Sequence, residues 1–190
     1  MAMATALSAW CAYQSNLWSG QMINSYSVSG HTRARASLLS VQAQQIQASD
    51  VGLFVQYAAA ISEGNRELAT FLYHRFRPEM RHAVTAWNAT KPIVNPRAPA
   101  TPFEMPEYSI AQTKQSAELD ARAEREAEEA RRANRISDRY VLLTVFFAMV
   151  LFFVGIAGSF SSLLGRMAFN ALALGVLVIA AISMVLLPRA

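Results

Sequence analysis

Cysteine, histidine and charged residues are all scarce in this chain. Its 190 residues include one cysteine, Cys11, and three histidines, and only 16% are Asp, Glu, Lys or Arg. A single cysteine excludes an internal disulfide, so the sequence does not indicate a redox compartment. Neither a glycine-rich phosphate loop nor a nucleophile elbow occurs, and three scattered histidines do not build a Ser/His/Asp arrangement. The sequence therefore predicts no enzyme and no small-molecule substrate.

Charge is absent altogether from two runs near the end of the sequence, residues 140–157 and 168–187. Each is about as long as a helix that crosses a ~30 Å hydrocarbon core. A helix satisfies its own backbone groups in lipid, and the short connection predicts an antiparallel transmembrane hairpin. Without charge inside the spans, the usual mark of an ion or proton relay is missing. The alternative is a pair of buried core helices in a soluble protein.

The first 30 residues also contain no charged side chain. The apolar part of this segment is too short to span a bilayer comfortably and lacks the basic region of a secretory signal. Trp10 and Trp18 are typical of an aromatic belt at a membrane surface. Residues 1–19 are therefore predicted to be either a short first membrane helix or an interfacial helix.

Proline and glycine are missing from Glu107 to Val154, which predicts one long helix there. Its charged first part, 108–139, carries Glu and Arg at i,i+4 spacing and is expected to be exposed to water. A thin apolar stripe along it is suited to a close, coiled-coil-like partner helix. The stripe consists of Ala123, Ala127, Ala130 and Ala133.

Where prolines do occur, they cluster. Five prolines within 91–107 exclude helix or central strand and predict an extended strap, with a polyproline-II ligand as the alternative. Before it, Gly64-Asn65 is typical of a helix stop and turn, and Pro78 is typical of the start of a short helix.

The predicted fold class is an all-α membrane protein, a long helical hairpin with a short helical tip, a Pro-rich strap and a C-terminal two-helix transmembrane hairpin. The predicted segments are a first membrane or interfacial helix (1–19), a helical extramembrane domain (20–90), the Pro-rich strap (91–107), a charged stalk helix (108–139) and two transmembrane helices (140–157 and 168–187).

Asp50 is the one acid on the apolar stripe of the helix predicted for 31–62. A buried acid needs a partner, and the candidates are Arg75, Arg77 and Arg81. The alternative is that Asp50 lies at a solvent-exposed edge of the stripe and needs no partner. The same three arginines are also a candidate site for an anionic partner or lipid headgroup, against the alternative of a solvated helix face.

Two weaker patterns remain. Glu79 and His82 have the i,i+3 spacing of half a di-metal site, and His74 is nearby, but no second Glu-x-x-His occurs, so neither metal nor cofactor is predicted. Small residues four apart favour close helix packing within the spans. These pairs are Gly155 with Ser159 and Ala171 with Gly175.

Three stretches carry a resemblance that covers nearly the whole chain: WCAYQSNLWSGQ, then FLYHRFRPEMRHAVTAWNATKPIVNPRAPATPFEMPEY, then ANRISDRYVLLTVFFAMVLFFVGIAG. They resemble a family of small bacterial membrane proteins of unknown function. The resemblance implies one N-terminal span, a helical extramembrane domain, two C-terminal spans and a bacterial inner membrane. It brings no catalytic residues. Relatives have a longer first span, so the start of this chain departs from the pattern.

The predicted function is a non-enzymatic accessory or scaffold subunit of a larger membrane assembly. The alternatives are a homo-oligomeric channel or transport component and a membrane-tethered module that binds an anionic partner. The expected partners are the lipid bilayer and other membrane subunits or further copies of this chain, and not nucleic acid. Arginines flanking the spans on the domain side favour a cytoplasmic domain by the positive-inside rule, whereas a more basic loop in related proteins favours the reverse.

Overall fold

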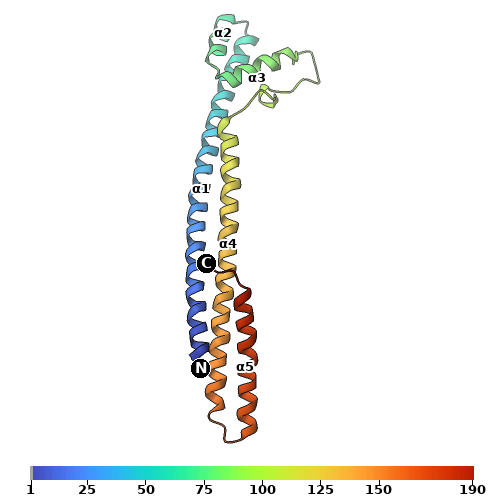
Figure 1. Cartoon of the computed structure of the whole chain (residues 1–190). Coiled ribbons are helices and arrows are strands. Elements are labelled where there is room, and N and C mark those ends of the chain that lie inside the picture. The colour runs from blue at the N-terminus through green and yellow to red at the C-terminus, as the bar shows by residue number, and fades with distance from the viewer. Residues whose placement is uncertain (1) are drawn as a thin grey trace. The chain divides into compact units, whose positions relative to one another are not determined.

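The computed structural model describes residues 2–190, which form helices and no strands. The elements are α1 (Ala2–Ser62), α2 (Arg66–Arg75), α3 (Pro78–Ala89), the short 3-10 helix η1 (Pro102–Glu104), α4 (Ala111–Ala157) and α5 (Leu163–Leu186) (Figure 1). The prediction of an all-α protein is confirmed. The chain divides into two compact units. The first unit joins the residues up to His31 to Arg122–Ala190, and the second unit is Thr32–Ala121.

The first unit is a three-helix arrangement of the start of α1, most of α4 and all of α5 (Figure 1). One buried cluster joins Cys11 of α1 to Tyr140 and Phe147 of α4 and Ala180 of α5. A second buried cluster joins Ala4, Val150 and Ala173. Ala180 in the first cluster and Ala4 and Ala173 in the second are small residues, which allow neighbouring helices to pack closely.

Between α1 and α4 the contact is made by alanine and serine. The stripe Ala123, Ala127, Ala130 and Ala133 is buried. Beside it the Ser29 Oγ donates to the Ala123 carbonyl at 2.8 Å, and the Ser15 and Ser19 hydroxyls each lie 3.0 Å from the Ser137 Oγ. The partner helix for which the alanine stripe is suited is therefore α1 of the same chain.

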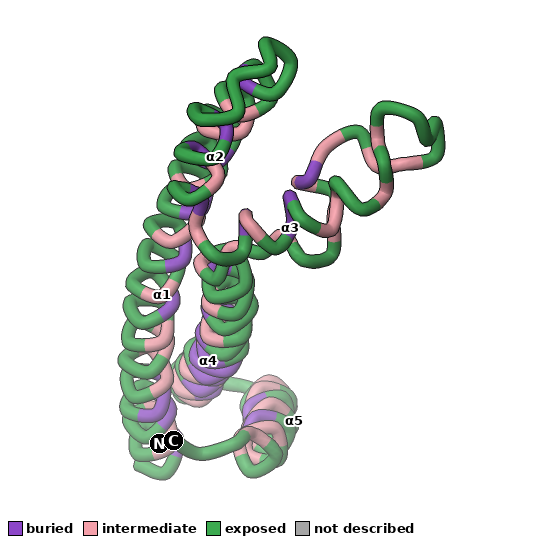
Figure 2. The backbone as a smooth tube through the Cα atoms, turned by 90° about the horizontal axis from the view of Figure 1, so that it is seen from above, coloured by how far each residue is buried: buried purple, intermediate pink, exposed green. Residues whose placement is uncertain are grey.

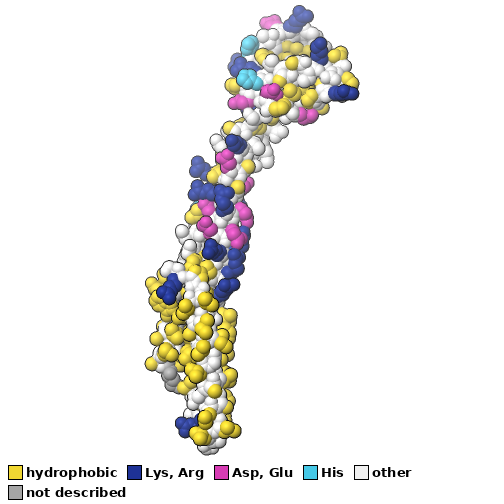
Figure 3. Space-filling model, turned by 45° about the vertical axis from the view of Figure 1, so that its right-hand side comes forward, with side chains coloured by type: hydrophobic (Ala, Val, Ile, Leu, Met, Phe, Trp, Pro, Cys, Tyr) yellow, Lys and Arg dark blue, Asp and Glu magenta, His cyan; other side chains and the backbone are white. Residues whose placement is uncertain are grey.

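Two helices, α4 and α5, are long and apolar enough to cross a membrane. Only 28% and 11% of their most apolar windows are buried, so the apolar side chains of these windows lie mostly on the surface. Figure 2 shows how few positions of α5 are buried. In Figure 3 hydrophobic side chains cover this part of the first unit, and charged side chains gather beyond it.

Several predicted boundaries differ from those of the structure. The helix α1 continues through residue 19 without a break, because neither Gly20 nor Gly30 interrupts its hydrogen bonding. The helix α4 begins at Ala111 rather than residue 108, after the strap has ended. The helix α5 begins at Leu163 rather than residue 168, because the Ser162 hydroxyl caps it by accepting from the Gly165 N–H at 3.3 Å.

In the second unit the turn residues act as their chemistry predicts. Gly64 has a φ of +74° and ends α1, and the Asn65 N–H next to it donates to the Ala60 carbonyl at 2.9 Å. The Asn65 side chain then caps α2 by accepting from the Leu68 N–H at 3.1 Å. Pro78 occupies the first turn of α3.

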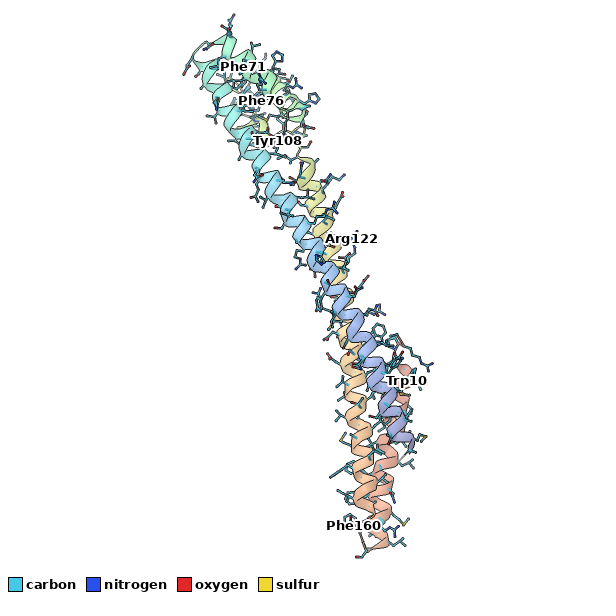
Figure 4. The ribbon with its side chains drawn as sticks, turned by 90° about the vertical axis from the view of Figure 1, so that its left-hand side faces the viewer. Trp10, Phe71, Phe76, Tyr108, Arg122 and Phe160 are labelled. Carbon is cyan, nitrogen blue, oxygen red and sulfur yellow. The ribbon has the colours of Figure 1, made fainter. Side chains whose placement is uncertain are left out.

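An aromatic and aliphatic core holds the second unit together. Phe76, Met80 and Val84 are buried against side chains of α1 and of the segment that leads into α4. Figure 4 labels Phe76 and Tyr108, which both belong to this core. The core therefore fixes α2, α3 and the proline-rich segment against one stretch of α1.

Candidate functional site

A half-open groove of about 580 Å³ lies in the second unit. It is lined by α1, by the end of α3 and by the residues that follow α3. Its lining residues are Phe54, Tyr57, Ala58, Ile61, Ser62, Trp87, Asn88, Lys91, Pro92, Ile93 and Val94. A volume of this size lies within the range of binding pockets, and most of the lining is apolar.

Aromatic rings hold the floor of this groove. Phe54 packs edge-to-face against Trp87, with centroids 5.5 Å apart, and against Phe103 at 5.7 Å. The Trp87 Nε1–H donates to the Pro99 carbonyl at 2.8 Å, which attaches the proline-rich segment to α3. Because edge-to-face ring pairs and a satisfied indole N–H both restrict rotation, the floor is preformed.

The rim of the groove is a turn with an uncommon backbone. Lys91 has a φ of +52°, which is left-handed and unusual for a residue with a side chain. Its carbonyl accepts from the N–H groups of both Val94 and Asn95 at 3.0 Å, so the turn is closed by backbone hydrogen bonds. The turn leaves Ile93 93% exposed and Val94 76% exposed. Two adjacent aliphatic side chains with so little contact are a site at which a partner can bury apolar surface.

A buried polar cluster lies elsewhere in the second unit. The Asp50 Oδ2 accepts from the Arg77 Nε at 2.7 Å and from the Tyr108 hydroxyl at 3.0 Å. The Asp50 side chain is only 6% exposed. The cluster thus joins α1, the residue before α3 and the residues before α4.

Arg77 completes this cluster with two further contacts. Its Nη1 donates to the Glu79 Oε2 at 3.0 Å, and its Cζ lies 5.2 Å from the centroid of the Tyr108 ring. The buried Nη2 has no hydrogen-bond partner among the residues the structure describes. The aromatic face of Tyr108 partly replaces that missing partner, because a ring attracts a cation placed over it.

The pKa values agree with this geometry. Burial, together with the bond to the Asp50 carboxylate, raises the pKa of Tyr108 to about 12. Burial alone would lower the pKa of Arg77, but its bonds to Asp50 and Tyr108 outweigh this and raise it. The backbone N–H at the start of α3 and the Arg77 charge lower the pKa of Glu79. Tyr108 therefore stays protonated and donates to Asp50 at all ordinary pH values.

The three arginines of the predicted anion site lie in different surroundings. Arg77 is bound to Asp50, as described above. Arg75 is exposed, and its Cζ lies 4.9 Å from the centroid of the Phe71 ring. Arg81 is half-buried, and its carbonyl accepts from the Thr85 hydroxyl. The structure therefore brings Arg77 to Asp50 and leaves Arg75 as the most exposed cation of the three.

The remaining predicted residues lie on the surface. His74, Glu79 and His82 are all exposed, and no group of metal-ligating side chains occurs within residues 2–190. In the first unit the small residues of the proposed helix-packing pairs are also exposed. These residues are Gly155, Ser159, Ala171 and Gly175. The α4–α5 contact within the chain uses Ala173 and Ala180 instead.

Sequence reasoning missed two partners of the site. In the sequence Tyr108 stands at the start of the predicted long helix, 58 residues from Asp50, so no local pattern shows that its hydroxyl donates to this acid. The bond from Trp87 to Pro99 was missed because a carbonyl within a proline-rich segment gives no local signal. Both contacts join residues that are distant in the sequence.

No protein-family model matches the chain, and comparisons with curated proteins and with solved structures also give no match. The resemblance to a bacterial membrane family thus stays a prediction. Function is inferred below from the groove, the surfaces and the contacts of the chain itself.

Proposed function

We propose that this chain is a membrane-anchored, non-enzymatic accessory subunit whose second unit binds another protein of the same membrane assembly. The groove beside Ile93 and Val94 is the observation that carries this proposal. It combines a preformed aromatic floor with two nearly fully exposed aliphatic side chains at its rim. Interfaces are dominated by such apolar anchors in preformed pockets.

The membrane anchor is supported by the exposed apolar surface of α4 and α5. The core helix of a soluble protein is mostly buried, whereas the apolar windows of these two helices are mostly exposed. Acyl chains are the solvent that suits such a surface, and two spans joined by a short turn form a transmembrane hairpin. The first part of α1 packs on both spans, where Ala4 joins Val150 and Ala173, and therefore lies beside them in the membrane. The rest of α1, the charged part of α4, the strap and the two short helices then form the extramembrane part.

The orientation proposed is a cytoplasmic second unit in a bacterial inner membrane. Basic residues are concentrated just before the first span and are few in the turn between the spans. The basic residues before the span are Arg131, Arg132, Arg135 and Arg139, against Arg166 after the turn. The positive-inside rule counts basic residues irrespective of neighbouring acids, so Arg131 and Arg135 favour the cytoplasmic side although both form ion pairs.

The second candidate function is self-association of the spans, as in a channel component. Ala171 and Gly175 face outward, and a Cβ added at Gly175 would meet nothing within 4 Å. An exposed small-residue pair allows close approach of a helix from a second copy. By contrast, the binding module based on three arginines is disfavoured, because Arg77 is already bound to Asp50.

The test is site-specific photocrosslinking in intact membranes from a reactive amino acid at position 93. We expect one stoichiometric foreign subunit in the crosslinked product, and its loss when Val94→Glu is added. The matched control is Leu38→Glu, which changes a 65% exposed aliphatic residue of the same unit to the same acid. Equal loss with both acidic substitutions, or no crosslink, contradicts the docking groove. A crosslink only to further copies of this chain favours the second candidate.

A further inference from the structure

We infer that the first unit holds one anionic phospholipid, with its phosphate at Arg139 and one acyl chain in a groove between α4 and α5. The groove has a volume of about 310 Å³. It is lined by Arg139, Leu142, Leu143, Phe146, Ser183, Leu186 and Leu187. This inference rests on the membrane placement in the proposed function but not on the protein-docking groove.

The lining follows from helix periodicity. On α4 the lining positions are 139, 142, 143 and 146, which are spaced i, i+3, i+4 and i+7 and therefore share one face. On α5 and the residue after it, positions 183, 186 and 187 share a face in the same way. Arg139 is thus the charged end of a groove whose other lining residues are mainly aliphatic. Ser183 has a small side chain, so it leaves space open in the groove.

Arg139 lies at the level at which a phosphate would be. The Trp18 indole and the Tyr140 hydroxyl both donate to the Pro188 carbonyl, at 3.3 Å and 3.2 Å, so these two side chains meet at the level of Tyr140, the residue that follows Arg139 in the sequence. Trp and Tyr are enriched at the headgroup region of membranes. The apolar lining then runs from this level toward the hydrocarbon core.

The charge of Arg139 has no anionic partner among the residues that the structure describes. No acidic residue occurs anywhere in 139–190, which contains three arginines, or in residues 1–30. Asp138, the nearest acid in sequence, accepts a hydrogen bond from Asn134, while Arg131 and Arg135 are paired with glutamates. No ion pair of Arg139 is found within residues 2–190, so an anion from the bilayer is the group that complements it.

The occupant is a glycerophospholipid with a net negative headgroup, because such a molecule brings a phosphate to Arg139 and an acyl chain to the groove without a cation of its own. The acyl chain of a zwitterionic lipid would fill the groove equally well, but the positive group of its headgroup would be repelled by Arg139. The predicted property is therefore headgroup selection, rather than the general solvation by lipid that every membrane span has.

The test is native mass spectrometry of the full chain released from nanodiscs that contain phosphatidylglycerol and phosphatidylcholine in equal amounts. We expect the wild type to retain one phosphatidylglycerol preferentially. Arg139→Gln should lower that preference about fivefold, as expected for one basic residue at an anionic surface. Ser183→Phe, which fills the groove, should lower retention of the lipid with Arg139 still present.

The matched control is Arg125→Gln, which removes the same charge from an exposed position on α4 roughly 20 Å further along the helix. Unchanged preference in Arg139→Gln overturns the site, and so does an equal decrease in Arg125→Gln, because that result would mean unspecific attraction. Carbonate extraction of membranes is measured in parallel. Release of the wild type by carbonate contradicts the membrane placement itself, whereas retention without headgroup selection contradicts only the lipid site.

Discussion

The two units of this chain are stabilised by different means. In the first unit alanine and serine line the contact between α1 and α4, a few large side chains such as Tyr140 and Phe147 are buried, and most apolar side chains of α5 are exposed. In the second unit large rings fill the core, and a buried acid binds an arginine and a tyrosine from other segments. In the proposed membrane the first unit would gain nothing by burying more leucine, because acyl chains are equally apolar, so close backbone packing would decide its structure. The second unit, on the proposed water side, buries its rings because exposed apolar surface is unfavourable in water, and its buried polar contacts specify how the rings are arranged.

The charged residues of the two units differ in the same way. On α4 the ion pairs between Glu124, Glu128, Arg131 and Arg135 are exposed on the helix surface. Arg131 and Arg135 lower the pKa of Glu128, and its glutamate partners raise the pKa of Arg131. Such exposed pairs contribute little to stability, since water and salt screen them. The Asp50 pair of the second unit is shielded from water and is expected to matter far more.

The largest effect is therefore expected from Asp50→Asn. It removes the buried anion of the Arg77 guanidinium and leaves only the exposed Glu79, and breaking a buried ion pair costs about 3 kcal/mol or more. Hydrogen exchange of the detergent-solubilised protein should show faster exchange in residues 32–121 and little change in the spans. Glu128→Gln, which removes an exposed acid of the first unit, is the control and should leave both units unchanged.

A double-mutant cycle decides whether the ion pair itself is responsible. If Asp50 acts through Arg77, Arg77→Gln should cost less in the Asp50→Asn background than in the wild type. Strictly additive losses of stability would show that each side chain acts independently. The ion pair would then stabilise the second unit no more than the exposed ion pairs of α4 stabilise the first.

The next effect is expected in the first unit. Ala130 is fully buried in the stripe that faces α1, so Ala130→Leu inserts three carbons where the helices touch. Overpacking of this kind costs about 2 kcal/mol. The thermal unfolding midpoint in detergent should fall, and exchange should rise in α1 and α4 of the first unit. Ala121→Leu, at an exposed position on the same helix, should leave both unchanged.

The sequence predicted those features that depend on neighbours in the chain. Gly64 ends α1 and Pro78 begins α3, as predicted, because the backbone conformation of each residue alone favours that position. The uncharged runs predicted two helices that are long and apolar enough to cross a membrane. The continuity of α1 through Gly20 and Gly30 was not predicted, since the uncharged first part and the later part with an apolar stripe look like separate segments in the sequence. The groove was equally out of reach, because Trp87 and Ile93 form it together with α1 residues such as Phe54 that lie far away in the sequence.

The smallest effect is expected from Tyr108→Phe, which keeps the ring over Arg77 but removes one hydrogen bond to Asp50. A hydrogen bond to a charged group contributes about 1.5 kcal/mol. The pKa of Tyr108 is raised to about 12 in the folded chain, above the ordinary tyrosine value of about 10. Its contribution should therefore be complete below pH 10 and lost as the pH rises through 12, because deprotonation removes the donor and places a second anion beside Asp50.

The difference in chemical-denaturation stability between wild type and Tyr108→Phe measures this contribution. It should be constant from pH 7 to 9 and shrink above pH 10. Tyr26→Phe, at a tyrosine that is 45% exposed in the first unit, is the control and should show neither the offset nor the change with pH. A pH-independent difference would mean that the hydroxyl acts by packing alone. The buried polar cluster would then reduce to the Asp50–Arg77 pair, and the second unit would resemble the first more closely than its structure indicates.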